Sequence, residues 1–299
     1  MSSTSEIGEQ QNAATNVSQT NVSRTRASSW SLWTRQTLAI MRLEIKKNFL
    51  SRRALLLYLM AGLPLVLLSM LALFPPPTDE MENFSQLSQV YAAIYGGLIL
   101  RTLVFFGCAW VFMNLFRGEV IDRSLHYYFL APVRREVLVV GKYLSGLIAT
   151  VLLFSITTVG SMLILYFWLF PSESARYFFD GAGASQMLAY LGVTILACVG
   201  YGAVFLLVGL FFRNPIIPAL LLYGWEWLNF LLPPLLKKIS VIHYLQSLVP
   251  VPMSEGPFAV LVEPTPAWIS VPSLLLFTGV VLFLASRHLR RMEISYAGD

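Results

Sequence analysis

The chain has 299 residues, of which 56% are hydrophobic and only 12% are charged, and its mean hydropathy is +0.66. This composition excludes an ordinary soluble globular domain and is typical of an integral membrane protein. The formal net charge of +5 reflects cations gathered on one side of a membrane, so we do not interpret it as nucleic-acid binding.

The first 29 residues form a polar segment rich in Ser, Thr, Asn and Gln, with almost no large apolar side chains. Such a segment cannot bury enough surface to offset the entropy lost on ordering. We therefore expect a disordered cytoplasmic tail over residues 1–29, followed by one transmembrane domain over residues 30–299. The tail has no apolar stretch of its own and does not look like a cleavable signal peptide.

The segment from Trp33 to Arg53 carries the pattern of an amphipathic helix. Its apolar stripe consists of Leu38, Met41, Ile45 and Phe49, and a cationic stripe of Arg35, Arg42, Lys46 and Arg53 runs beside it. We expect an interfacial helix whose apolar stripe contacts membrane lipids while its cations face lipid phosphates. The alternative is a solvated helix that only fixes topology. A second apolar side, made of Ile40, Leu43 and Leu50, favours contact with a cytoplasmic partner.

Six apolar runs are each long enough to cross a bilayer as a helix, which takes ~20 residues. They show no period-2 alternation of the kind that marks membrane barrels. The runs cover Ala54–Phe74, Tyr91–Phe116, Tyr143–Phe170, Met187–Phe212, Ile216–Leu236 and Ala267–Ser286. The sequence thus predicts an all-α integral membrane protein with six transmembrane helices.

The positions of Lys and Arg predict how these helices are oriented. Residues 1–53 hold eight cations, residues 116–142 five, Arg213 is one more, and three follow Ser286, whereas the opposite side holds only three. Because cytoplasmic loops are enriched in Lys and Arg, we expect both termini in the cytoplasm. That orientation requires an even number of crossings and so supports the weakest span, Ile216–Leu236. We expect a multi-pass protein of the cytoplasmic (inner) membrane.

Residues 116–142 are the only long charge-rich segment between two spans. Its ionised residues are Arg117, Glu119, Asp122, Arg123, Arg134, Arg135, Glu136 and Lys142. A residue before proline avoids the helical conformation, so a first helix should end near Leu130 and a second should begin at Pro132. Two short helices below the membrane would form a projection that a soluble partner can push.

Two ionisable residues lie within predicted spans, Arg101 in the second and Glu226 in the fifth. At ~1.5 Å per residue, Arg101 lies about 22 Å and Glu226 about 18 Å above the cytoplasmic surface. The difference is within reach of an Arg side chain, so the two could form a pair. The alternatives are that Arg101 extends to the outer surface, and that Glu226 is protonated or lines a watery path.

The last outer loop, Pro233 to Pro266, is long and rich in proline. Residues 239–248 within it form a semi-apolar piece that is too short to span and fits an interfacial or re-entrant helix.

The sequence contains no motif for catalysis or for metal binding. It has no GxxxxGK[ST] phosphate loop, so we expect no ATP hydrolysis by this chain. His126, His243 and His288 are scattered, and Cys108 and Cys198 lie within spans. We therefore expect no catalytic residue, no metal site, no disulfide and no cofactor in the chain.

The central segment resembles the cytoplasmic loop of ABC-2-type permeases, the membrane subunits of ATP-driven ABC exporters. The residues that carry the resemblance are Glu119, Ser124-Leu125, Pro132-Val133, Arg135 and Gly141-Lys142. Arg123 and Ser124 stand where the family usually has Gly and Thr. The order of the amphipathic helix, six spans and a long last outer loop is similar too.

The resemblance implies a cytoplasmic coupling helix between the second and third spans, on which a separate ABC ATPase subunit docks. We expect coupling roles for Glu119, Asp122, Arg123, Ser124, Pro132, Arg134, Arg135, Gly141 and Lys142 of this segment. ATP and Mg²⁺ would be held by the partner subunit, and the permease would form a homodimer or a heterodimer that exports a substrate. The resemblance names no substrate. On the residues alone, an ATPase-independent channel or secondary carrier, and a membrane anchor for a cytoplasmic partner, stay open.

Overall fold

The computed structural model describes residues 33–51, 54–74, 84–121, 135–212, 214–251 and 265–291, and every regular element within these ranges is helical. A helix over residues 33–50 comes first. The elements that follow are α2 (Ala54–Leu73), α3 (Phe84–Ile94), η2 (Tyr95–Val104), α4 (Phe105–Ile121), α6 (Arg135–Leu169), α7 (Pro171–Phe179), α8 (Gly183–Phe211), α9 (Ile216–Trp227), η3 (Leu228–Leu231), α10 (Pro234–Lys237), α11 (Val241–Gln246) and α12 (Ala267–Arg291).

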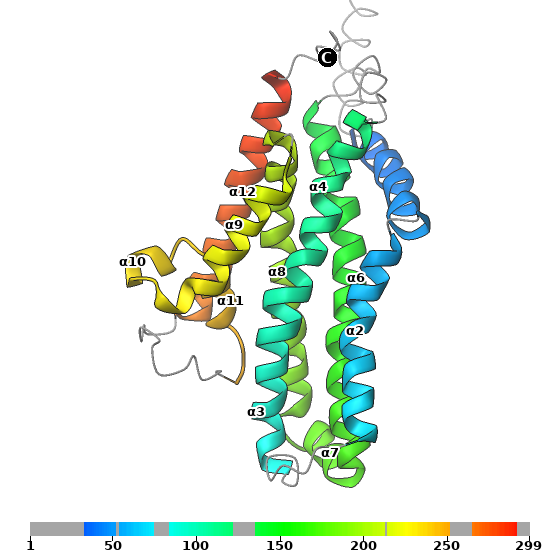
Figure 1. Ribbon diagram of the computed structural model, residues 1–299, viewed down its shortest axis with the longest axis vertical. Coiled ribbons are helices and arrows are strands. Elements are labelled where there is room, and N and C mark those ends of the chain that lie inside the picture. The colour runs from blue at the N-terminus through cyan, green and yellow to red at the C-terminus, as the bar shows by residue number, and fades with distance from the viewer. Residues whose placement is uncertain are drawn as a thin grey trace, which may run out of the picture.

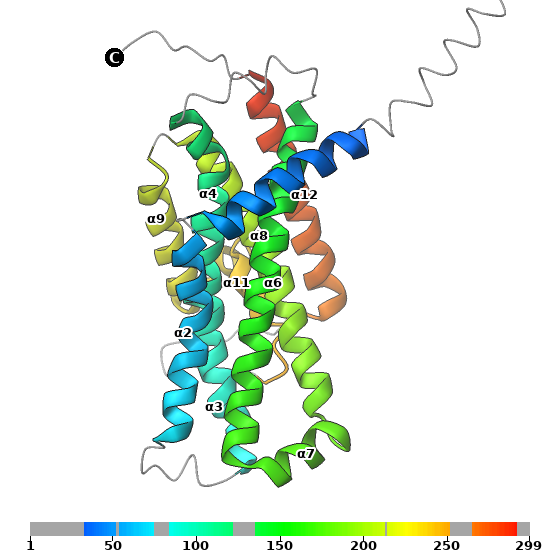
Figure 2. The ribbon, with the colours of Figure 1, turned by 90° about the vertical axis from the view of Figure 1, so that its right-hand side faces the viewer.

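The long helices stand side by side in a bundle, and the helix over 33–50 crosses one end of it obliquely (Figures 1 and 2). That end also holds the last turns of α4 and α12 and the first turns of α6. The short helix α7 closes the opposite end (Figure 1). We call the end crossed by the helix over 33–50 the junction end.

Within the described ranges, five helices are long and apolar enough to cross a membrane. They cover Ala54–Leu73, Gln86–Phe116, Arg135–Leu169, Gly183–Phe211 and Ala267–Arg290. The prediction of an all-α protein with several membrane-length helices is confirmed at this level.

The predicted fifth span is shorter than expected. Its helix runs over Ile216–Leu231 only, which is below the length that crosses a bilayer. The cause is the Pro233–Pro234 pair, because Leu232 before it takes extended backbone angles (φ −73°, ψ 147°) and cannot continue the helix. The chain then turns through α10 and α11 part-way along the bundle (Figure 1). A count of six spans therefore stays a prediction.

Two predicted spans also extend further than their apolar runs. The second is continuous from Phe84 to Ile121 through α3, η2 and α4, and the third begins at Arg135 instead of Tyr143. Charged residues end an apolar run but do not end a helix, since Arg, Lys and Glu are good helix formers. The helix α6, with 35 residues, is consequently longer than the ~20 residues that cross a bilayer.

The middle of the second span is a π-helix of ten residues, η2. The hydroxyl of Thr102 donates to the carbonyl of Gly97, five residues earlier, at 3.1 Å. Wide turns of this kind are rare, and they occur most often at functional positions. Arg101 lies on this segment.

Buried polar groups tie the bundle together in the half near α7. Tyr91 Oη donates to the carbonyl of Thr158 at 2.9 Å, and Tyr95 Oη donates to the carbonyl of Tyr190 at 3.1 Å. Thr158 and Thr194 hydroxyls lie 3.0 Å apart. These bonds connect the second span with α6 and α8 and satisfy groups that would be costly to leave unpaired inside a membrane.

Several predictions fall outside the described residues. They include the disordered tail over 1–29, Arg53 of the cationic stripe, and the predicted break in the coupling segment, which lies within residues 122–134. Asp122, Arg123, Ser124, Pro132 and Arg134 belong to the latter group. Glu119 lies on the last turns of α4, but its side chain is outside the description.

Candidate functional site

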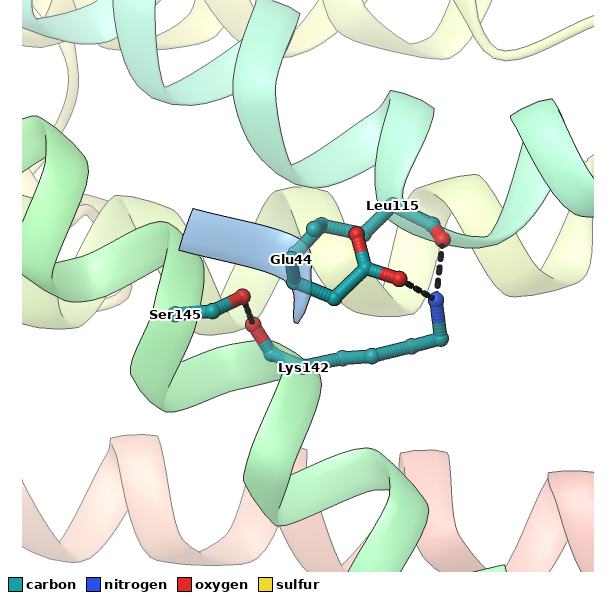
Figure 3. A network of polar contacts seen from close by, with 4 residues as sticks. All are labelled: Glu44, Leu115, Lys142 and Ser145. Carbon is teal, nitrogen blue, oxygen red and sulfur yellow. Dashed lines mark hydrogen bonds and ion pairs between the residues drawn. The ribbon is translucent and has the colours of Figure 1, made fainter. Parts of the chain in front are cut away.

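The junction end is built around a buried ion pair between Lys142 and Glu44 (Figure 3). The Nζ atom of Lys142 donates to Glu44 Oε1 at 2.7 Å and to the backbone carbonyl of Leu115 at 2.8 Å. Nζ also lies 5.2 Å from the centre of the Phe116 ring. One side chain on α6 thus contacts both the helix over 33–50 and the end of the transmembrane part of α4.

Both charges of this pair are removed from solvent, since the side chain of Lys142 is 0% exposed and that of Glu44 is 4% exposed. A buried charge is tolerated only when a partner of opposite sign and further hydrogen bonds replace the lost water. Removing one partner of such a pair typically costs about 3–5 kcal/mol. The pair therefore makes the packing of these three helices strongly interdependent.

The local sequence explains how the two helices come so close. A methyl group at Gly141 would lie 3.1 Å from Cγ2 of Ile40 and 3.5 Å from the carbonyl oxygen of Thr37. A side chain at position 141 would be tightly packed against the helix over 33–50, so glycine favours this close approach to α6. Glu44 follows Ile40 by one helical turn on the same face, which places its carboxylate beside Lys142.

A bond within α6 and a bond to α8 accompany the ion pair. Ser145 Oγ donates to the carbonyl of Lys142 at 2.7 Å, within the network shown in Figure 3. Tyr143 Oη donates to the carbonyl of Val199 on α8 at 2.9 Å. Through Tyr143, this part of α6 is attached to α8 as well as to the helix over 33–50 and α4.

The beginning of α6 also holds the end of α12. Arg135 Nη1 donates to the carbonyls of Leu289 and Arg290 at 2.8 and 2.9 Å, and Glu136 forms an ion pair with Arg290. The last carbonyls of a helix have no partner within it, so a guanidinium is a suitable ligand for them. The Glu136–Arg290 pair is largely exposed and contributes little to stability.

On the helix over 33–50, the buried and exposed sides differ from those that the sequence predicts. Ile40 was expected to face a partner protein, but it is buried against α6 of the same chain. Leu43 and Leu50 are exposed, and so is Leu38 of the predicted lipid-facing stripe. Met41, Ile45 and Phe49 are half-buried, and the cations Arg35, Arg42 and Lys46 are exposed.

Of the residues expected to couple to an ATPase, the structure describes the side chains of Arg135 and Lys142 and the position of Gly141. All three contact other parts of this chain. Because Lys142 is fully buried, any part it has in coupling runs through Glu44 and Leu115 and not through direct contact with a soluble partner. The sequence analysis did not identify Glu44. The feature that could have pointed to it is its position between two apolar sides of the helix over 33–50, where a carboxylate would be buried.

The structure describes both Arg101 and Glu226, and the predicted direct ion pair between their side chains is not present. The Glu226 carboxylate accepts bonds from Tyr201 Oη at 3.1 Å and from the backbone nitrogens of Val241 and Ile242 at 3.1 and 2.8 Å. The guanidinium of Arg101 lies 5.8 Å from the ring centre of Trp227, next to Glu226 in the chain. The amides at the start of α11 lack helical partners and so bind the carboxylate instead.

In the described part of the chain, no group of three or more His, Cys, Asp or Glu residues lies close enough to bind a metal ion. Cys108 and Cys198 are both buried as free thiols.

A comparison of the chain with protein-family models gave no match, and neither did a comparison with curated proteins. The function is therefore argued from the geometry of the chain itself.

Proposed function

We propose that the chain is the permease subunit of an ATP-driven ABC-2-type transporter, moved by a separate cytoplasmic ATPase that docks on residues 116–142. The observation that carries this proposal is the double contact of Lys142 with Leu115 and Glu44. Lys142 closes the segment 116–142, and its ammonium group is bound to the residue just before the segment begins. A force applied to the segment therefore acts on α4, on α6 and on the helix over 33–50 together.

The length of α6 supports the same conclusion. The helix is uninterrupted from Arg135 to Leu169, and its 35 residues span about 50 Å at 1.5 Å per residue. A displacement at Arg135 would pass along a rigid element into the membrane half near α7. Movement of rigid helices about packed contacts is a common way of transmitting a conformational change.

In this proposal the junction end faces the cytoplasm, as the excess of Lys and Arg there indicates. Both termini would then lie in the cytoplasm, and the α9–η3 segment would complete six crossings together with the turn through α10 and α11. A second permease copy or a related permease would pair with the chain. The partner ATPase would hold ATP and Mg²⁺, and the substrate class is left open.

The test is purification of the full chain in a gentle detergent from its own cells. An ATPase should co-purify, and its turnover should depend on the permease. Replacing residues 122–131 with a Gly/Ser segment of the same length should abolish co-purification while membrane insertion is kept. The matched control replaces residues 252–261 in the outer loop in the same way.

If the 122–131 replacement retains the ATPase as well as the control does, the docking assignment is wrong. If transport proceeds in vesicles with no ATPase present, the chain is a channel or secondary carrier and the proposal fails.

A further inference from the structure

A cavity of about 230 Å³ lies beside the Glu44–Lys142 pair, between the helix over 33–50, the start of α2 and the adjoining part of α4. Its polar side is formed by Glu44, Lys47, Asn48, Ser51 and Asn114. Its apolar side is formed by Ala54, Leu57, Val111 and Leu115, with Trp110 beside them. The lining is thus amphiphilic and changes from polar to apolar where the chain enters α2.

The polar side offers hydrogen-bond donors and a positive charge. Lys47 is exposed at the cavity, and Ser51 contributes a hydroxyl. The side-chain nitrogen of Asn48 is buried, and no group in the described ranges accepts a hydrogen bond from it. A buried donor without a partner is unfavourable, so an acceptor on a bound group would stabilise it at this position.

The charge balance of the cavity favours a singly charged anion. Glu44 lines the cavity, but its carboxylate is neutralised by Lys142. The positive charge of Lys47 then gives the lining a net charge of about +1. This charge is complementary to a phosphodiester, which carries one negative charge, and less so to doubly charged inorganic phosphate. Donors and a cation arranged around an oxyanion are the usual means of phosphate recognition in proteins.

The apolar side decides between a free phosphate and a lipid. Ala54 is the first residue of a membrane-length helix, so a membrane crossed by α2 would begin at the height of this cavity, with Ser51 toward the head groups and Leu57 toward the acyl chains. Trp110, an indole at the same height, is the residue type that favours this interface. A soluble phosphate would leave the apolar side unused.

We propose that this cavity binds the head group of a phospholipid, with its phosphodiester held by Lys47, Asn48 and Ser51 and its acyl chains lying along α2 and α4. The site is lined by the helix over 33–50, the start of α2 and α4. It depends only on the membrane placement of α2 and not on the proposed ATPase partner. Glu44 lines the cavity and is also one partner of the buried ion pair, so a bound lipid would contact the junction end directly.

The experiment measures lipid binding to the full chain in detergent micelles by native mass spectrometry. The probe is phosphatidylglycerol with palmitoyl and oleoyl chains. Diacylglycerol with the same chains tests whether the phosphate is needed, and inorganic phosphate tests whether the chains are needed. The variants are Lys47→Gln and Asn48→Leu. Lys46→Gln is the matched control, since it removes the same charge from the same helix outside the cavity lining.

We expect the wild-type chain to retain one tightly bound phosphatidylglycerol. Loss of a charge-assisted hydrogen bond should weaken its binding by about tenfold in Lys47→Gln and by a similar factor in Asn48→Leu, while Lys46→Gln stays within about twofold. Neither diacylglycerol nor inorganic phosphate should displace the lipid. Because Lys47 is exposed, its substitution leaves folding intact.

Equal binding in Lys47→Gln and Lys46→Gln would overturn the proposal. Displacement by inorganic phosphate would identify a free-anion site, and displacement by diacylglycerol an apolar groove without head-group recognition. Either of these results also rejects the phospholipid site.

Discussion

Lys142 is the residue on which the junction end depends most. Its ammonium group is enclosed by Glu44, the Leu115 carbonyl and the Phe116 ring, so its charge is stabilised only by the chain itself. A buried pair of this kind adds little net stability compared with two apolar side chains, but it strongly penalises the loss of one partner. The pair therefore makes one arrangement of three helices much more favourable than the alternatives in which the charges are separated.

Replacing Lys142 by Met leaves Glu44 buried without its partner. We expect a loss of about 3–5 kcal/mol in the free energy of unfolding, measured by chemical denaturation in detergent. The double variant Glu44→Leu/Lys142→Met should recover most of this loss. The control is Glu136→Ala, which removes an exposed pair and should cost less than about 1 kcal/mol. A double variant as unstable as the single one would contradict this account.

Glu226 is the second buried acid whose partners belong to the chain. Exchanging the two intramembrane residues, as Arg101→Glu/Glu226→Arg, should not restore the stability lost in Glu226→Leu. An arginine at 226 cannot accept the bonds that the Val241 and Ile242 amides donate to the carboxylate. Thermal unfolding in detergent measures the effect, with Tyr201→Phe as the milder variant that removes one bond. Recovery in the exchanged variant would show that Arg101 and Glu226 pair after all.

At the scale of the element, hydropathy predicts the long helices well because burial in lipid depends on composition and length. It locates helix ends poorly. Apolar runs stop at Tyr143 and Phe116, but the helices continue to Arg135 and Ile121, since helical hydrogen bonds do not require apolar side chains. The π-helix η2 was not predicted, because an apolar run indicates a helix without specifying its hydrogen-bond register.

The candidate site could be predicted only in part. A charged segment ending at Gly141 and Lys142 was visible in the sequence, whereas the partner of Lys142 was not. Glu44 lies 98 residues earlier, and only the close approach of two helices at Gly141 makes the pair. Side-chain partners across such distances are set by tertiary packing, which local periodicity does not contain.

The approach at Gly141 can be tested by size. Gly141→Val should push the helix over 33–50 away from α6 and destabilise the chain by about 1–3 kcal/mol, the usual cost of overpacking. Ile40→Ala in the same chain should relieve part of the effect, because Ile40 is the side chain that a larger residue would meet. Unfolding in detergent provides the measurement. Gly62→Val serves as the control, since no described atom lies within 4 Å of a methyl group there.

At the scale of the whole molecule, the junction end gathers contacts that extend through the bundle. Lys142 connects α6 to α4 and to the helix over 33–50, Tyr143 connects it to α8, and Arg135 connects it to α12. Residues 122–134 stand between these contacts in the chain. A partner that moved this segment would move a rigid set of helices and not a loose loop.

Two substitutions in the same segment should separate coupling from assembly. Glu119→Ala should lower the turnover of the co-purified ATPase and the rate of transport while stability is unchanged, because coupling requires this residue in our proposal.

Arg135→Ala should instead lower the free energy of unfolding by about 1–2 kcal/mol, since the Leu289 and Arg290 carbonyls lose a charged donor. Arg135→Lys should recover only part of that loss, because an ammonium lacks the planar fork of the guanidinium. Unchanged turnover and transport in Glu119→Ala would remove this residue from the coupling path, and full stability in Arg135→Ala would show that the contact with α12 is not needed to hold the junction end.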